Sequence, residues 1–229
     1  MHKKGKKDLF SFLEKVMCGF FLLPFFISFL CAQTKSIQGY SDSMKSGTVV
    51  IFVNGTEMTR VPLSDGAFNV DLTLEGKSQV LQVIVFDEKG NPERRKIMDL
   101  TDEEKEHFDT VVSIKSSVAA ALAKYNPKIA STLEETENEN FEDLVMLISM
   151  VCDVIHQIKL SNALSSLELI DRLLNGENLV AILQDRLGNE MGGLALAELK
   201  KSDFPKDQEG NVNFQILNRL IGDLKFSLK

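Results

Sequence analysis

The stretch GTVVIFVNGTEMTRVPLSDGAFNVDLTL, residues 47–74, sets the fold expected for the first half of this chain. The dipeptides Asn54-Gly55 and Asp65-Gly66 separate apolar runs, and the last of these runs alternates apolar with polar residues. Asn-Gly and Asp-Gly favour two-residue hairpin turns, because both central positions of a type I′ turn need positive φ. The stretch therefore predicts antiparallel strands joined by tight turns.

The same pattern continues toward the C-terminus. Glu75-Gly76 signals another turn, residues 80–86 form a nearly continuous apolar run, and the polar segment 87–92 signals a further turn before 94–100. Short strands at regular spacing, separated by glycine-containing turns, are typical of a small antiparallel sandwich. We therefore expect such a sandwich over residues 40–100.

The order VNG, DGAFNVDLTL-EG and VLQVIVFDEKGN resembles bacterial immunoglobulin-like modules of the glucodextranase B-domain type. The matching positions are Ile51, Val53, Gly55, Asp65, Gly66, Phe68, Leu74, Gly76, Leu81, Val83, Val85, Asp87, Gly90 and Asn91. The resemblance implies an Ig-like β-sandwich that serves as a spacer or binding module on an exported bacterial protein. It implies no catalytic residues.

The periodicity changes after residue 100. Thr101 and Glu104 have the spacing of a capping box, which predicts a helix that begins here. Helical spacing of apolar residues continues until Asn126-Pro127, which ends or kinks the helix. The acidic and polar stretch 131–140 is typical of a solvated linker.

Further helices are expected in the remainder of the chain. A strongly apolar segment over 141–159 predicts a central buried helix. Shorter helices are predicted over 165–174, 177–187, about 194–201, and 214–226. The sequence thus predicts an α+β protein: an Ig-like sandwich followed by an α-helical bundle over 101–229.

The N-terminal segment 1–32 has the pattern of an export signal. Four lysines within residues 3–7 precede an uncharged apolar run over 16–32. Three outcomes stay open for this segment: cleavage after Ala32, acylation at Cys31 as in bacterial lipoproteins, or retention as a membrane anchor. The protein is therefore expected in the periplasm or cell envelope, with membrane contact only through this segment.

Charge and cysteine content restrict the partners. The chain has 26 Lys and Arg against 33 Asp and Glu, and five lysines and two acidic residues lie in the first 33 positions, so the remainder has a net charge of −10. An acidic body argues against nucleic-acid binding. Cys152 is the one cysteine beyond the signal, which excludes an intrachain disulfide in the body, and its apolar neighbours predict burial.

Two carboxylate–histidine pairs are the candidate metal ligands. Glu104 and His107, and likewise Asp153 and His156, are three positions apart, which is one turn on a helix. Pairs of this kind build di-metal sites in bundles when other helices supply two further Glu residues. Such Glu partners do not stand out here, so the sequence predicts no metal, no cofactor and no catalytic residues.

The segment 205–216 is similar to an EF-hand loop. Asp207 and Gly210 stand at the third and sixth positions of such a loop. Pro205 and Ile216 occupy the first and twelfth positions, where a carboxylate and a bidentate Glu normally bind calcium. A degenerate calcium loop and a polar turn before the last helix both stay open.

These observations favour a non-enzymatic exported envelope protein that acts as an interaction or spacer module. Its expected partners are proteins or glycans of the envelope. The alternative hypothesis is a metal-binding protein or enzyme whose site lies in the helical half.

Overall fold

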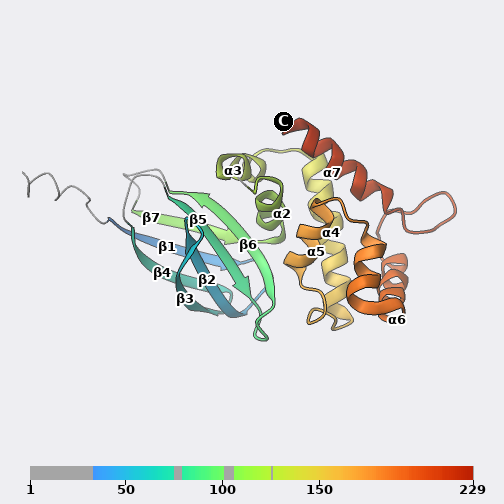
Figure 1. Ribbon diagram of the computed structural model, residues 1–229, viewed down its shortest axis with the longest axis horizontal. Helices are drawn as coiled ribbons and strands as arrows, with labels where there is room; N and C mark the ends of the chain where they lie inside the picture. The colour runs from blue at the N-terminus through green and yellow to red at the C-terminus, as the bar shows by residue number, and fades with distance from the viewer. Residues whose placement is uncertain (1–32, 75–78, 101–105, 125, 229) are drawn as a thin grey trace, which may run out of the picture.

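The computed structural model describes residues 33–74, 79–100, 106–124 and 126–228, which form one sheet followed by a helical region (Figure 1). The strands are β1 (Gln33–Ser41), β2 (Ser46–Val53), β3 (Thr56–Ser64), β4 (Ala67–Leu74), β5 (Val80–Phe86), β6 (Pro92–Asp99) and β7 (His107–Val112). The helices are α2 (Ile114–Leu122), α3 (Pro127–Glu135), α4 (Glu139–Gln157), α5 (Ser166–Leu174), α6 (Leu179–Lys201) and α7 (Gln215–Ser227).

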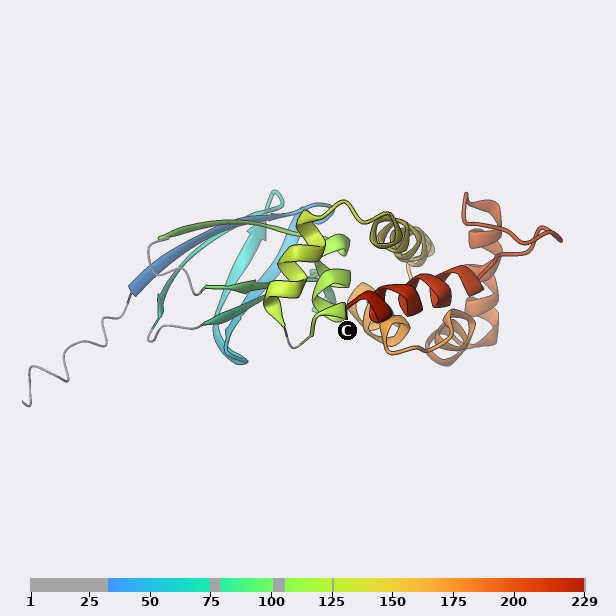
Figure 2. The same ribbon diagram turned by 90° about the horizontal axis from the view of Figure 1, so that it is seen from above.

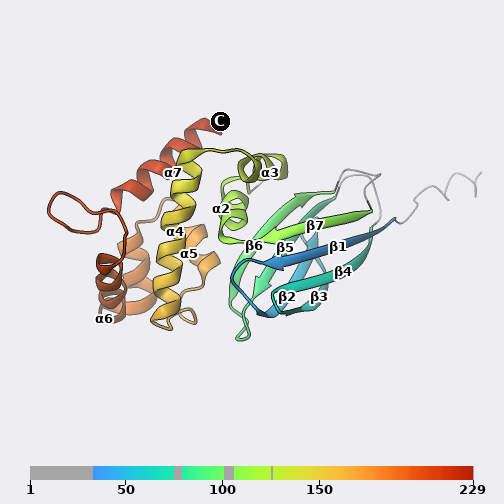
Figure 3. The ribbon, with the colours of Figure 1, turned by 180° about the vertical axis from the view of Figure 1, so that it is seen from behind.

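The seven strands of the described residues form one mixed sheet in the order β6-β5-β2-β3-β4-β1-β7. All neighbours pair antiparallel except β1 and β7, which are parallel. The sheet curls until its end strands β6 and β7 approach each other, which gives a nearly closed barrel (Figures 1 and 3). The predicted Ig-like sandwich is therefore wrong, because its strands belong to a single curled sheet rather than to two stacked ones.

The predicted hairpin turns at 54–55 and 65–66 are confirmed, whereas the turn predicted at Glu75-Gly76 lies outside the described residues. Asn54 and Gly55 have φ values of 48° and 80°, and Asp65 and Gly66 have 52° and 80°. Positive φ at both central positions matches the twist of the flanking strands. In β4, buried and exposed residues alternate along the strand, as the sequence pattern predicts.

The predicted helix start at residue 101 is wrong for the part that the structure describes. Residues 107–112 form β7, whose burial alternates with a period of two. The helix that follows, α2, begins only after Ser113, and the Ser113 and Ser116 side chains form its capping box. The expected capping residues 101–104 lie outside the described residues.

Long-range pairing places β1 in the sheet, although no local turn signal in the sequence predicted this strand. Ile37 is fully buried, and Gly39 lies against the Phe68 ring of β4. A Cβ at Gly39 would lie 2.4 Å from Phe68 Cζ and 2.7 Å from Thr110 Cγ2 of β7. Glycine at this position therefore allows β1 to lie between β4 and β7.

The helical region partly follows the sequence pattern. The central helix α4 and the later helices α5 and α7 form where they were predicted. Residues 131–135 of the expected linker instead belong to α3, which begins at Pro127 with Asn126 as its N-cap. Gly188, with a φ of 73° and a ψ of 172°, breaks α6 where the sequence predicted an end.

Two hydrophobic cores hold the molecule together. One fills the sheet and includes Ile51, Leu81 and Val83. The other joins the helices and is centred on α4, with Phe141 and Leu147 fully or almost fully buried. The predicted helical bundle over 101–229 is corrected as well, because residues 107–112 form strand β7 of the sheet and α2, α3 and α5 contact β6 directly (Figures 1 and 2).

The predicted export segment 1–32, including Cys31 and Ala32, lies outside the described residues. Within the part that the structure describes, none of the helices has the length and apolar character needed to cross a membrane.

Candidate functional site

The charged run 93–96 in β6 joins the sheet to the helical region, and we call its contacts the junction. Successive side chains of a strand point to opposite faces. Arg95 pairs with Ile84, which packs against the helical core, so this face of β6 is directed at the helices. Arg94 pairs with Val85 of the sheet core and lies on the inner face.

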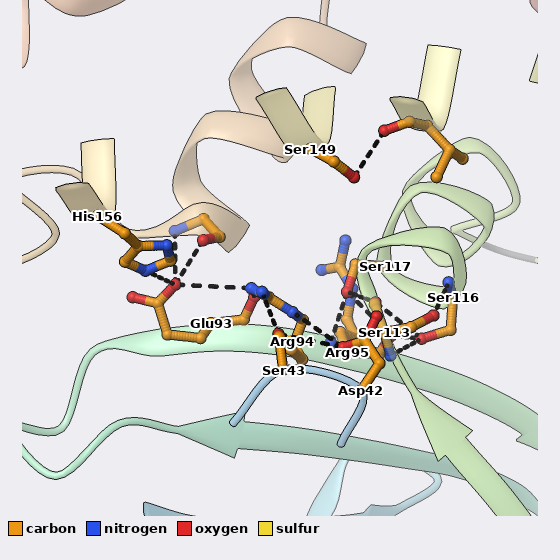
Figure 4. A network of polar contacts seen from close by, with 12 residues as sticks. Asp42, Ser43, Glu93, Arg94, Arg95, Ser113, Ser116, Ser117, Ser149 and His156 are labelled. Atoms are coloured by element: carbon orange, nitrogen blue, oxygen red, sulfur yellow. Dashed lines mark hydrogen bonds and ion pairs between the residues drawn. The ribbon is translucent and has the colours of Figure 1, made fainter. Parts of the chain in front are cut away.

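Glu93 is the centre of the junction and is only 1% exposed. Its Oε2 accepts hydrogen bonds from Ser166 N at 3.2 Å and from Ser166 Oγ at 2.5 Å. The same oxygen lies 3.2 Å from His156 Nε2 of α4 (Figure 4). One strand carboxylate thus binds two helices, α4 and α5.

The three side chains do not have the geometry of a catalytic triad. In a triad the hydroxyl nucleophile bonds to the imidazole, and the carboxylate orients the imidazole from its other side. Here the Ser166 hydroxyl donates to Glu93, and His156 contacts the same carboxylate oxygen. The arrangement therefore fastens elements together rather than activating a nucleophile.

Arg94 continues the network beside Glu93. It is 4% exposed, and its Nη2 donates to Ser43 Oγ at 2.7 Å while Nη1 donates to the Glu93 carbonyl at 2.9 Å. Asp42 Oδ1 lies 3.7 Å from Nε, and Glu93 Oε2 lies 3.8 Å from Nη1. The buried guanidinium therefore contacts both the loop between β1 and β2 and the Glu93 carboxylate that binds the helices.

Two further ion pairs cross the junction. Arg95 Nη2 lies 2.6 Å from Asp171 Oδ1 of α5, and Lys96 Nζ lies 2.6 Å from Glu134 Oε2 of α3. The Asp171 side chain is 46% exposed, so the Arg95 pair contributes little on its own, whereas Lys96 and Glu134 are only 19% and 16% exposed.

Serines of α2 cover the outer edge of β6. The Ser117 hydroxyl accepts from Arg95 N at 2.8 Å, and the Ser116 hydroxyl donates to Arg95 O at 2.8 Å. An end strand otherwise presents backbone donors and acceptors that invite pairing with another chain. The helix therefore replaces a neighbouring strand at this residue of β6.

Cys152 lies beside the junction on α4. Burial raises the pKa of its thiol to about 11, although the positive charge of Arg94 and a hydrogen bond with Ser166 oppose this effect. A thiol that stays protonated at neutral pH is a poor nucleophile. The prediction that Cys152 is a buried apolar side chain is confirmed.

The structure separates the predicted metal ligands. His107 is exposed at the start of β7, in a strand rather than a helix, and Glu104 lies outside the described residues. Asp153 and His156 do lie on one helix, α4, but His156 contacts Glu93. Within the ranges that the structure describes, no three His, Cys, Asp or Glu side chains group as metal ligands.

The EF-hand-like segment 205–216 forms a compact turn. Asp207 Oδ1 accepts from Glu209 N and Asn211 N, and Gly210 N donates to Asp207 O. The segment 87–91 has the same Asp-x-x-Gly-Asn sequence and the same hydrogen bonds. A shared turn motif therefore accounts for the aspartate and glycine that resembled calcium ligands.

An open cavity of about 800 Å³ lies on the sheet at β1, β4 and β7, which run side by side in Figure 3. We call it the groove. Its lining residues are Gln38, Gly39, Tyr40, Ala67, Phe68, Asn69, Lys96, Asp109, Thr110 and Val111. Alternation along the strands places four of these side chains on the exposed face of the sheet, namely Gln38, Tyr40, Asn69 and Asp109, whereas Phe68 and Thr110 are buried on the other face.

Two lining residues have unusual environments. Tyr40 is 53% exposed, which is high for a large aromatic residue. Thr110 is 5% exposed, and its Oγ1 has no hydrogen-bond partner in the described structure. A buried hydroxyl without a partner is unfavourable by about 1–3 kcal/mol, so Thr110 has an unused hydrogen-bonding capacity on the inner face of the sheet, on the same side as Phe68.

Sequence reasoning did not find these residues. Tyr40 and Asp109 lie in β1 and β7, two strands that were not predicted. For the junction a signal did exist, because four consecutive ionisable residues within a strand are unusual. Comparisons with protein-family models, curated proteins and solved structures give no match to this chain.

Proposed function

We propose that this chain is a non-enzymatic exported envelope protein that acts as an interaction module and binds its partner in the groove. The groove carries this proposal, because the exposed Tyr40 ring lies there on the same face of the sheet as two side-chain amides and the Asp109 carboxylate. Binding sites of proteins typically combine an apolar lining with a few polar groups in this way.

The junction supports a structural role for the helical region. Lys96 lines the groove and also pairs with Glu134 of α3 at 2.6 Å. Glu93 and Arg95, on the same strand, bind α4 and α5. The helices therefore hold β6, one wall of the groove, in place, as expected of a module that presents a preformed binding surface.

Export of the protein to the periplasm or cell envelope is part of the proposal. It rests on the basic and apolar pattern of residues 1–32. A partner in that compartment is then a protein or a glycan of the envelope.

Photocrosslinking in the native envelope tests the proposal. A photoreactive phenylalanine analogue replaces Tyr40 in the groove, and in a matched control it replaces Phe226, which is 83% exposed on α7. We expect defined adducts of protein or glycan from position 40, which disappear when Asp109 is also changed to Arg. Equal labelling from both positions, or none from position 40, would overturn the proposal.

A further inference from the structure

We infer that the groove binds a neutral, hydroxyl-rich ligand, namely a segment of an uncharged glycan. This inference rests on the proposed function and names the partner class for the same site. It follows from three features of the groove: its aromatic surface, its charge, and the free hydrogen-bonding capacity of its polar groups.

The aromatic surface suits a sugar ring. Tyr40 is about half exposed and presents its ring on the outer face of the sheet, whereas Phe68 is buried on the inner face. A sugar ring has apolar C–H faces and a polar rim of hydroxyl groups. Aromatic side chains with an apolar body and, in tyrosine, a polar tip match this division.

The charges at the groove favour an uncharged ligand. Lys96 is paired with Glu134 at 2.6 Å, so much of its positive charge is compensated. Asp109 adds a carboxylate to the lining. A sulfated, phosphorylated or carboxylated ligand would meet repulsion from this carboxylate. Hydroxyl groups, in contrast, can donate hydrogen bonds to it.

Hydrogen-bonding groups of both kinds line the groove. Gln38 and Asn69 pair across β1 and β4 and contribute side-chain amides, which both donate and accept. Vicinal hydroxyl groups likewise donate and accept. A volume of about 800 Å³ lies within the range of about 300–1,000 Å³ that is usual for ligand sites.

Isothermal titration calorimetry on the purified full-length protein tests the inference with three probes. These are cellotetraose, chitotetraose and a sulfated tetrasaccharide. We expect saturable binding of at least one neutral probe, and at least tenfold weaker binding of the sulfated one. Tyr40→Ala and Asp109→Leu should each weaken neutral binding at least tenfold, whereas the matched control Phe226→Ala should leave it unchanged.

Thermal unfolding of each variant separates lost binding from lost folding, because Tyr40 is exposed and its replacement should not lower the melting temperature. The inference is overturned if no neutral probe binds, if the sulfated probe binds most tightly, or if neither groove variant weakens binding. Protein adducts from position 40 without any oligosaccharide binding would overturn the glycan assignment while leaving the proposed interaction function intact.

Discussion

Replacing Glu93 by alanine should destabilise the protein more than any surface change. The carboxylate is 1% exposed and its Oε2 accepts two hydrogen bonds from Ser166. It also lies 3.2 Å from His156 Nε2 and 3.8 Å from Arg94 Nη1. Removing the carboxylate leaves the positive charge of the buried Arg94 guanidinium with less negative charge beside it. It also leaves the Ser166 N–H and O–H donors without their acceptor.

The magnitude follows from the burial of these groups. Removing one partner of a buried ion pair typically costs about 3–5 kcal/mol. Whole domains are stable by only about 5–15 kcal/mol, so the loss is a large share of the total. With a urea dependence of about 2 kcal/mol per molar, the unfolding midpoint should fall by about 2 M. Glu93→Gln keeps an acceptor for Ser166 and should lose less.

Urea unfolding followed by circular dichroism measures this effect. The matched control is Glu57→Ala, because Glu57 also bonds to an arginine, Arg60, but both side chains are exposed. The control should unfold at the same urea concentration as the wild type, since exposed ion pairs contribute little.

A double-mutant cycle separates the causes. If the loss in Glu93→Ala comes from an uncompensated charge on Arg94, it should shrink when Arg94 is changed to Met. The reasoning is refuted if Glu93→Ala loses no more stability than Glu57→Ala. It is also refuted if the two junction changes add without interaction.

Three further predictions concern separate parts of the chain. Gly39→Ala should lose about 1–3 kcal/mol of stability, because the new methyl group meets Phe68. The control Gly222→Ala faces open space on α7 and should not destabilise the protein. Thermal unfolding compares the two variants, and equal melting temperatures would contradict the prediction. The Cys152 thiol should resist a thiol reagent at pH 8 until urea unfolds the protein, and fast labelling of the native protein would disprove this. Since burial raises the pKa of this thiol from 9.0 to about 11, its ionisation should lower the free energy of unfolding only as pH rises from about 9 to 11. Millimolar calcium should produce no binding heat, because Asp207 already closes its turn, and saturable heat would show a working loop.

Local signals account for the part of the fold that the sequence predicts correctly. The turns at 54–55 and 65–66 fix φ values within the dipeptide itself, so the strands beside them can be placed without any tertiary information. The central helix α4 is likewise predictable, because its apolar residues recur with helical spacing and are buried.

Long-range pairing explains the failures. β1 contains few apolar residues, and its place is set by pairing with β4 and, in parallel, with β7. In β7, Phe108, Thr110 and Val112 alternate in the strand pattern. The acidic residues 102–104 after Thr101 led to the prediction of a helix, and the alternation over 108–112 was too short to predict a strand instead. The difference between a sandwich and a curled sheet depends on these two strands, so local turn chemistry cannot decide it.

The junction shows what a charge run can reveal about tertiary structure. Glu93 and Arg94 are adjacent at a β-bulge, where the pairing with β5 shifts between Val85 and Phe86, and they are only 1% and 4% exposed. Their burial needs cover from outside the sheet, and α4 and α5 contact Glu93 while the loop at Asp42 and Ser43 contacts Arg94. Charged side chains are rarely buried unless they are paired. A strand that carries adjacent buried charges therefore needs pairing partners from other elements, and the helical region supplies those of Glu93.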